Sequence, residues 1–126
     1  MVISLPLQIT TKEIQPGIVV LEIAGPIHMG PACHQITQEV EQLLGRSENR
    51  LIFDLTKATF LDSGGLGEIV RCFSKAKKSG GSLRLAGAQG MIATVIRLTK
   101  VDRVIEMYPT AVGAAVNFLP GAEGGS

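Results

Sequence analysis

The apolar and polar positions in the first third of the chain predict a hairpin followed by a helix. Apolar side chains recur at every second position from 19 to 23, after the turn pair Pro16-Gly17, which is typical of a half-buried strand. Residues 3–11 are the expected hairpin partner, and Gly25-Pro26 is expected to end the second strand. Between residues 31 and 48, apolar residues at 32, 36, 40, 43 and 44 predict an amphipathic helix with proline in its first turn.

The rest of the chain alternates between predicted strands and helices. The short apolar run at 51–55 is typical of a strand covered on both faces, and it is the predicted central strand. A helix is expected after Gly64-Gly65, with apolar side chains at 66, 69, 70 and 73 and a polar end at 75–81. We then expect a strand over 82–86, a third helix with 92, 95, 96 and 99 buried, and a short strand over 104–107. Thr110 is the predicted cap of a fourth helix whose small face comprises positions 111, 114, 115 and 118.

This order predicts the α/β fold class, with a mixed, mostly parallel central sheet of about five strands and about four helices packed against it. A chain of 126 residues with 45% hydrophobic residues can bury one core. We therefore expect a single domain over residues 1–120 and a flexible C-terminal tail over 121–126.

Charge and composition exclude several classes of partner. Twelve basic and eleven acidic residues leave a formal charge of +1, too little to gather nucleic acid or an anionic membrane. Cys33 and Cys72 are too few and too far apart for a disulfide-stapled secreted scaffold. The N-terminus lacks the basic and apolar regions of a signal peptide, and no apolar stretch approaches the roughly 18 residues of a membrane span. The expected location is the cytoplasm.

The segment over residues 55–67 carries the candidate chemistry, because it places Ser63 at the start of a helix that follows the central strand. A helix N-terminus at this edge of an open α/β sheet offers free N–H groups and a dipole that favour an anion such as a phosphate. Asp62-Ser63 is also compatible with a helix cap and nothing more. Capping does not require three glycines at 64, 65 and 67, since an interior glycine costs a helix up to about 1 kcal/mol. This pattern indicates close access to the backbone.

Two stretches carry a family resemblance. Phe53-Asp54-Leu55 followed by Phe60-Leu61-Asp62-Ser63-Gly64-Gly65-Leu66-Gly67 resembles the signature of bacterial anti-sigma factor antagonists, the soluble members of the STAS domain family. The similarity continues in the Gly25 turn, in the Ser79-Gly80-Gly81 turn, and in the closing strand and helix. The same domain type occurs in sulphate transporters and in stressosome-like scaffolds.

The resemblance implies a partner-switching phosphoprotein that regulates transcription in a bacterial stress response. It implies that Ser63 is phosphorylated by an anti-sigma factor serine kinase of the GHKL type, and that the unphosphorylated form binds this kinase and releases the sigma factor. A phosphatase of the PP2C type would reset the switch. The implied partner-binding residues are Asp62, Ser63, Gly64, Gly65, Leu66, Gly67 and His28. No catalytic residue, cofactor or metal is implied, and we expect a monomer when the protein is free. The alternative is a phosphorylation-independent scaffold or signalling-complex subunit.

Two positions depart from the family pattern. The family usually has a second Ser or Thr after the phosphorylated serine, where this chain has Gly64. The family also tends to have an acidic residue in the turn before the first helix, where this chain has His28. These departures leave open which kinase acts on the chain, and a histidine in the turn could add pH sensitivity.

Other chemistry finds little support in the residues. His28, Cys33 and His34 are metal-ligating types, but no second cluster supplies the remaining ligands. A serine hydrolase built on Ser63, a histidine and Asp54 would require glycine two residues before the serine, where the chain has Leu61. The glycines lack the lysine and Ser/Thr of a phosphate-binding loop. We interpret Cys72 as a small buried hydrophobe, and the lysines at 75, 77 and 78 as a solvated helix end.

Overall fold

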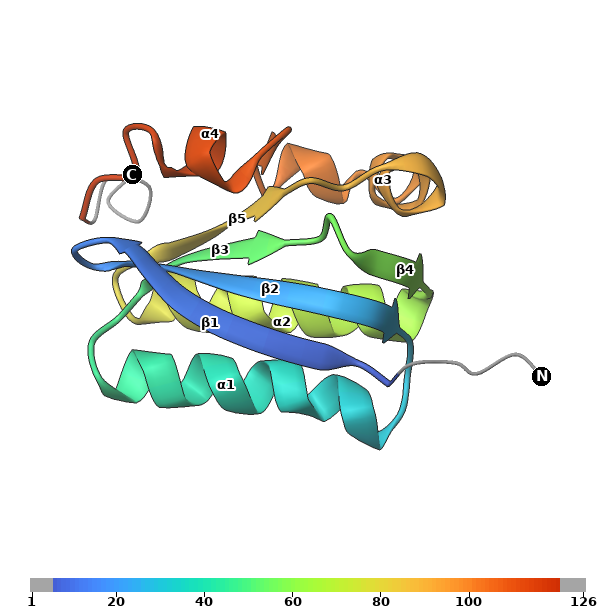
Figure 1. Cartoon of the computed structure of the whole chain (residues 1–126), viewed down its shortest axis with the longest axis horizontal. Helices are drawn as coiled ribbons and strands as arrows, with labels where there is room; N and C mark the ends of the chain where they lie inside the picture. Colours follow the sequence, from blue (N-terminus) through green and yellow to red (C-terminus); the bar gives the residue numbers. More distant parts are fainter. Residues whose placement is uncertain (1–5, 121–126) are drawn as a thin grey trace.

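The computed structural model describes residues 6–120, in which strands and helices alternate (Figure 1). Within these residues the chain forms six strands: β1 (Gln8–Gln15), β2 (Ile18–Ile27), β3 (Arg50–Asp54), β4 (Ala58–Leu61), β5 (Ser82–Ala86) and β6 (Met107–Tyr108). The described α-helices are α1 (His34–Gly45), α2 (Ser63–Lys78), α3 (Gly90–Leu98) and α4 (Ala111–Ala115). Single turns of 3₁₀ helix lie at Pro31–Cys33 and Val101–Arg103.

The sheet has the order β1-β2-β3-β5-β6, with β4 paired to the end of β2. β1 and β2 form the predicted antiparallel hairpin, whereas β2, β3, β5 and β6 run parallel. β3, which contains most of the apolar run at 51–55, lies in the middle of this order, as predicted. The mixed, mostly parallel sheet with helices packed against it is confirmed.

The prediction that Gly25-Pro26 ends the second strand is wrong, because β2 continues to Ile27. Gly25 has a positive φ of 93°, and the register shifts between Gly25 and Pro26. β2 therefore leaves β3 and pairs with β4, a strand that the pattern did not predict. The Gly25 N–H donates to the Lys57 carbonyl at 3.0 Å. This bend brings the end of β2 beside the start of α2.

The two faces of the sheet are covered unequally (Figure 1). α1 and α2 lie against one face, over a large hydrophobic core that includes Leu21, Phe53 and Leu85. Cys72 is fully buried in this core, in agreement with its interpretation as a small hydrophobe. α4 lies against the other face over a smaller core, in which its predicted small face is buried at Ala114, with Ala115 and Phe118.

Several element boundaries differ from the predictions. The predicted strand over 104–107 is reduced to Met107–Tyr108, because Val101–Arg103 is a 3₁₀ turn and the Ile105 N–H donates to the Val101 carbonyl at 2.9 Å. The first long helix begins with a separate 3₁₀ turn and ends at Gly45. β1 extends to Gln15, four residues beyond the predicted 3–11. The start of that range and the tail predicted over 121–126 lie outside the described residues.

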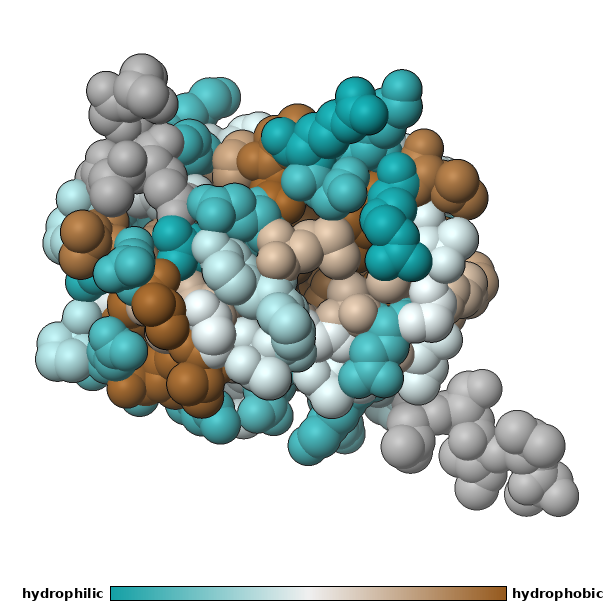
Figure 2. All heavy atoms as spheres, turned by 90° about the horizontal axis from the view of Figure 1, so that it is seen from above, coloured by the Kyte–Doolittle hydropathy of each residue, from teal (hydrophilic) through white to brown (hydrophobic). Residues whose placement is uncertain are grey.

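Exposed apolar side chains occur on α3, on α4 and beside them: Leu98, Val104, Val112, Val116 and Leu119. In Figure 2, which looks at this side of the molecule, brown apolar spheres form separate patches divided by more polar residues. Within residues 6–120, no helix combines the length and the hydropathy needed to cross a bilayer.

Candidate functional site

Asp62 fixes the first turn of α2. It has an extended backbone and follows β4 directly, so its side chain can turn back over the start of the helix. Its Oδ1 accepts a hydrogen bond from the Gly65 N–H at 2.7 Å. Both carboxylate oxygens lie 3.2 Å from the Met29 N–H, in the loop after β2. Asp62 therefore caps α2 and also ties it to the segment that precedes α1.

These contacts also set the charge of Asp62. The hydrogen bond from the Gly65 N–H makes the largest contribution and lowers the pKa of the carboxyl below its ordinary value of 3.8. The N–H groups of Met29 and Gly64 and the nearby His28 act in the same direction, against a partial desolvation that raises the pKa. Asp62 is thus a carboxylate at neutral pH.

Ser63 is the first residue of α2 and is exposed. Asp62 supplies the side-chain cap of α2, and the Ser63 hydroxyl makes no hydrogen bond with residues 6–120. The side chain is therefore not needed for the helix start and is accessible from solvent. A phosphate there would lie at a helix N-terminus, where the dipole favours negative charge.

The three glycines of the segment have different surroundings. A Cβ on Gly65 would clash with the carbonyl oxygen of Ile27, so only glycine lets α2 approach the end of β2 this closely. A Cβ on Gly64 would come within 2.6 Å of the Met29 Cβ. A Cβ on Gly67 would meet nothing within 4 Å. Close packing explains the first two glycines and not the third.

The predicted site residues do not all share one surface. Asp62, Ser63 and Gly67 reach the surface at the start of α2, whereas Gly65 and Leu66 are buried beneath it. His28 is exposed near Asp62, and its ring makes a T-shaped contact with Phe60, with 6.3 Å between the ring centroids. Leu66 packs into the core, so its side chain does not present a contact to a partner.

A cavity of about 410 Å³ opens beside this surface, between the starts of α1 and α2. Its lining residues are Met29, Gly30, Cys33, His34, Gly64, Gly67, Glu68 and Arg71. The Glu68 carboxylate is buried and accepts a hydrogen bond from the Thr37 hydroxyl. It also lies 3.2 Å from Arg71 Nη1 and 3.7 Å from His34 Nδ1.

The structure does not assemble the other two chemistries considered from the sequence. Burial, assisted by the charges of Glu68 and Asp62, raises the pKa of the Cys33 thiol to about 11. In residues 6–120, no three His, Cys, Asp or Glu side chains are placed to hold a metal ion. Asp54 accepts hydrogen bonds from the Thr56 N–H and hydroxyl, at 3.0 and 2.6 Å, and not from a histidine.

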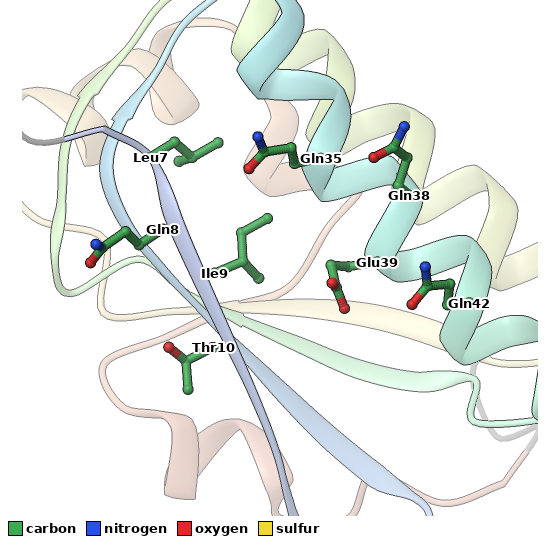
Figure 3. Close-up of a pocket in the computed structure, with 8 residues that line it drawn as sticks. All are labelled: Leu7, Gln8, Ile9, Thr10, Gln35, Gln38, Glu39 and Gln42. Carbon is green, nitrogen blue, oxygen red and sulfur yellow. The ribbon is translucent and has the colours of Figure 1, made fainter.

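A second groove, of about 470 Å³, lies between β1 and α1 (Figure 3). Ile9 of β1 and Leu7, the residue before β1, point toward α1, whose facing wall carries Gln35, Gln38, Glu39 and Gln42. Although this groove is larger than the one beside Ser63, none of the predicted site residues lines it.

Three residues that line the cavity beside the Ser63 surface were not predicted from the sequence. Met29, Glu68 and Arg71 come from a loop and from the second and third turns of α2. The spacing of Glu68 and Arg71, three residues apart on one helix, was the available signal for an ion pair. Nothing in the sequence indicated that Met29 would donate its N–H to Asp62, because that contact depends on the unpredicted strand β4.

Comparisons with known proteins agree with this architecture. The family model of the STAS domain matches residues 10–114. A Thermotoga maritima protein described as an anti-sigma factor antagonist is 29% identical over 70 residues, which is 56% of this chain and 62% of that protein. A Thermotoga neapolitana homologue is 26% identical with the same coverage. The chain thus matches less than two thirds of the length of these relatives.

Solved structures share the fold. An anti-sigma factor antagonist from Mycobacterium paratuberculosis superimposes with a TM-score of 0.77 at 21% identity, over 92% of this chain and 98% of the other. The Bacillus cell fate determinant SpoIIAA in its phosphorylated form superimposes with a TM-score of 0.67 at 17% identity, over 85% and 96% of the two chains.

Proposed function

The chain belongs to the STAS domain family, and from that premise we propose that it is an anti-sigma factor antagonist controlled by phosphorylation of Ser63. In its unphosphorylated form it binds an anti-sigma factor kinase of the GHKL type and releases the sigma factor. A PP2C-type phosphatase restores this form. In this proposal the protein acts in the cytoplasm as a binding module and as the kinase's substrate, and it is not a catalyst.

The observation that carries the proposal is the free, exposed hydroxyl of Ser63 at the first position of α2. A kinase can reach this hydroxyl without breaking a hydrogen bond of the fold. The Thermotoga maritima relative is named as an anti-sigma factor antagonist, and the chain shares its fold with SpoIIAA. Both similarities support the proposal that this chain is an anti-sigma factor antagonist.

The electrostatics of the site give the switch its sign. Phosphorylation adds about −1.5 to −2 charges at pH 7. The positive end of the α2 dipole tolerates this charge in the free domain. In a complex, the phosphate and the ionised Asp62 would both lose water against the partner, and two neighbouring negative charges make that desolvation costly. Phosphorylation therefore disfavours the complex more than the fold.

The test is a pull-down from the native host with three baits: Ser63→Ala, Ser63→Asp and Ser74→Asp. Ser74 is an exposed serine on the same helix, so its substitution adds the same charge away from the first turn. Mass spectrometry identifies the bound proteins. We expect a small GHKL-type ATPase on the Ser63→Ala and Ser74→Asp baits and its loss from Ser63→Asp.

If all three baits retain the same partners, phosphorylation of Ser63 is not a switch. The phosphorylation-independent scaffold would then replace the proposed function.

A further inference from the structure

Gly67 is the one glycine of the signature segment whose identity the packing of residues 6–120 does not explain. It lies in the second turn of α2, its φ is not positive, and a Cβ there would meet nothing within 4 Å. Alanine at an interior helical position is about 1 kcal/mol more favourable than glycine. Gly67 therefore weakens the helix without relieving any contact inside the fold.

What Gly67 provides is open space. It lines the cavity between α1 and α2, together with Gly64 one turn earlier. Gly64 packs against Met29, whereas Gly67 leaves the backbone of the second turn of α2 exposed on this wall. A side chain at position 67 would project into the opening from the helix surface.

The charges around the cavity are already paired with one another. Glu68 is held by Thr37 and by Arg71 and lies near His34. Cys33 is buried and, because burial raises the pKa of its thiol to about 11, it is uncharged at neutral pH. The Met29 side chain adds an apolar edge that is 71% exposed. An ammonium or carboxylate entering this cavity would lose water and find no unpaired opposite charge.

We propose that the cavity between α1 and α2 receives one uncharged, apolar side chain of the anti-sigma factor that docks beside Ser63, and that Gly67 keeps the cavity open for it. The inference rests on the proposed function for the identity of the partner. The cavity adjoins the Ser63 surface through Gly64, so a partner that covers Ser63 would also cover the opening. Because neither the cavity nor the entering side chain carries an unpaired charge, this contact would hold the partner in place through apolar packing. Phosphorylation of Ser63 would not change that packing directly.

The chemistry of the cavity can be tested on the isolated, unphosphorylated protein with N-acetyl-leucinamide, N-acetyl-lysinamide and N-acetyl-glutamic acid amide as probes. Amide chemical shifts measured by ¹H–¹⁵N NMR report the binding site. We expect saturable shifts at Gly30, Gly64 and Gly67 with the leucine probe, with a dissociation constant on the order of millimolar. The two charged probes should bind at least about five-fold more weakly, equivalent to about 1 kcal/mol.

A variant pair separates occupancy of the cavity from damage to the fold. Gly67→Leu fills the opening with a better helix former, and it should abolish the shifts at Gly30 and Gly64 while keeping or raising the melting temperature. Gly45→Leu is the matched control, because Gly45 also has open space around it and ends α1 away from the cavity. This control should bind the leucine probe as the wild type does.

Equal binding of all three probes, no saturable shifts, or unchanged binding by Gly67→Leu would overturn the inference. None of these results depends on a kinase. A result that contradicts the cavity proposal is therefore distinguishable from one that contradicts the phosphorylation switch, because the pull-down tests the switch separately.

Discussion

The starts of α2 and α4 are built alike, and their differences separate structure from function. Each helix follows an extended capping residue, Asp62 or Thr110, whose side-chain oxygen accepts from the N–H of a glycine three residues later. The distances are 2.7 Å to Gly65 and 3.0 Å to Gly113. α4 shows how little a capped start requires, namely one oxygen acceptor and one N–H donor.

α2 carries features beyond that minimum. Its cap is charged and also binds the Met29 N–H, its first residue is an exposed serine, and its second turn contains Gly67. At the matched first position α4 has Ala111. The extra cap contact belongs to the fold, because it joins α2 to the loop after β2. The serine and Gly67 do not, and they are the residues on which the two proposals rest.

The largest difference should appear when alanine replaces the matched glycines. Gly65→Ala places a Cβ against the Ile27 carbonyl, and we expect it to lower the free energy of unfolding by about 3 kcal/mol, the upper end for overpacking. Gly113→Ala meets only the Thr110 Oγ1 at 3.2 Å, so its change should stay within about 1 kcal/mol. Urea unfolding followed by circular dichroism measures both. Equal losses in the free energy of unfolding would mean that Gly65 is packed no more tightly than Gly113.

The two caps should differ by a smaller amount. Asp62→Ala removes the cap of α2 and the tie to Met29, with an expected loss of about 2 kcal/mol. Thr110→Ala removes one hydrogen bond, with an expected loss of about 1 kcal/mol. The same unfolding experiment compares them. A larger loss at Thr110 would contradict the view that Asp62 joins two segments.

The charge of the α2 cap adds a pH dependence that α4 lacks. Because the pKa of Asp62 in the folded protein lies below its ordinary 3.8, the carboxylate stabilises the fold above that value. This contribution is lost as the pH falls through the lowered pKa. Asp62→Asn keeps a capping oxygen but does not titrate, so the stability advantage of the wild type over this variant should shrink between about pH 5 and about pH 2. An advantage that stays constant over this range would exclude Asp62 as its source.

The fold could be predicted from the sequence where periodicity and burial agree. β5 and the stripe of α2 have the predicted positions, since alternating or 3.6-residue patterns reflect packing against the single sheet. β4 was missed because it is only four residues long. It pairs with β2 from the bend at Gly25 onward, where that strand was expected to end. The strand predicted over 104–107 fails because Ile105 is buried just after the 3₁₀ turn at Val101–Arg103, in a segment that is not a strand.

The candidate site was predictable only along its own segment. The sequence indicated Ser63 at a helix start and a surplus of glycine, and both follow from local rules. It could not indicate that Leu66 faces the core, or that Met29 and Glu68 approach from other turns, because those positions depend on how β4 and α1 dock on α2. Local signals locate the proposed phosphoacceptor, whereas its surroundings depend on tertiary packing.

The smallest expected effect is the most informative for the comparison. Ser63→Ala should change the free energy of unfolding by no more than about 0.5 kcal/mol, because the hydroxyl has no hydrogen-bond partner among residues 6–120. The reciprocal substitution on α4, Ala111→Ser, should be equally small. Urea midpoints measured side by side decide this. If Ser63→Ala alone lowers the free energy of unfolding by more than about 1 kcal/mol, the serine is part of the helix cap. Its exposure would then need no explanation in terms of a binding partner. A neutral result leaves Ser63 as an exposed residue that the fold does not use, as the proposed phosphorylation requires.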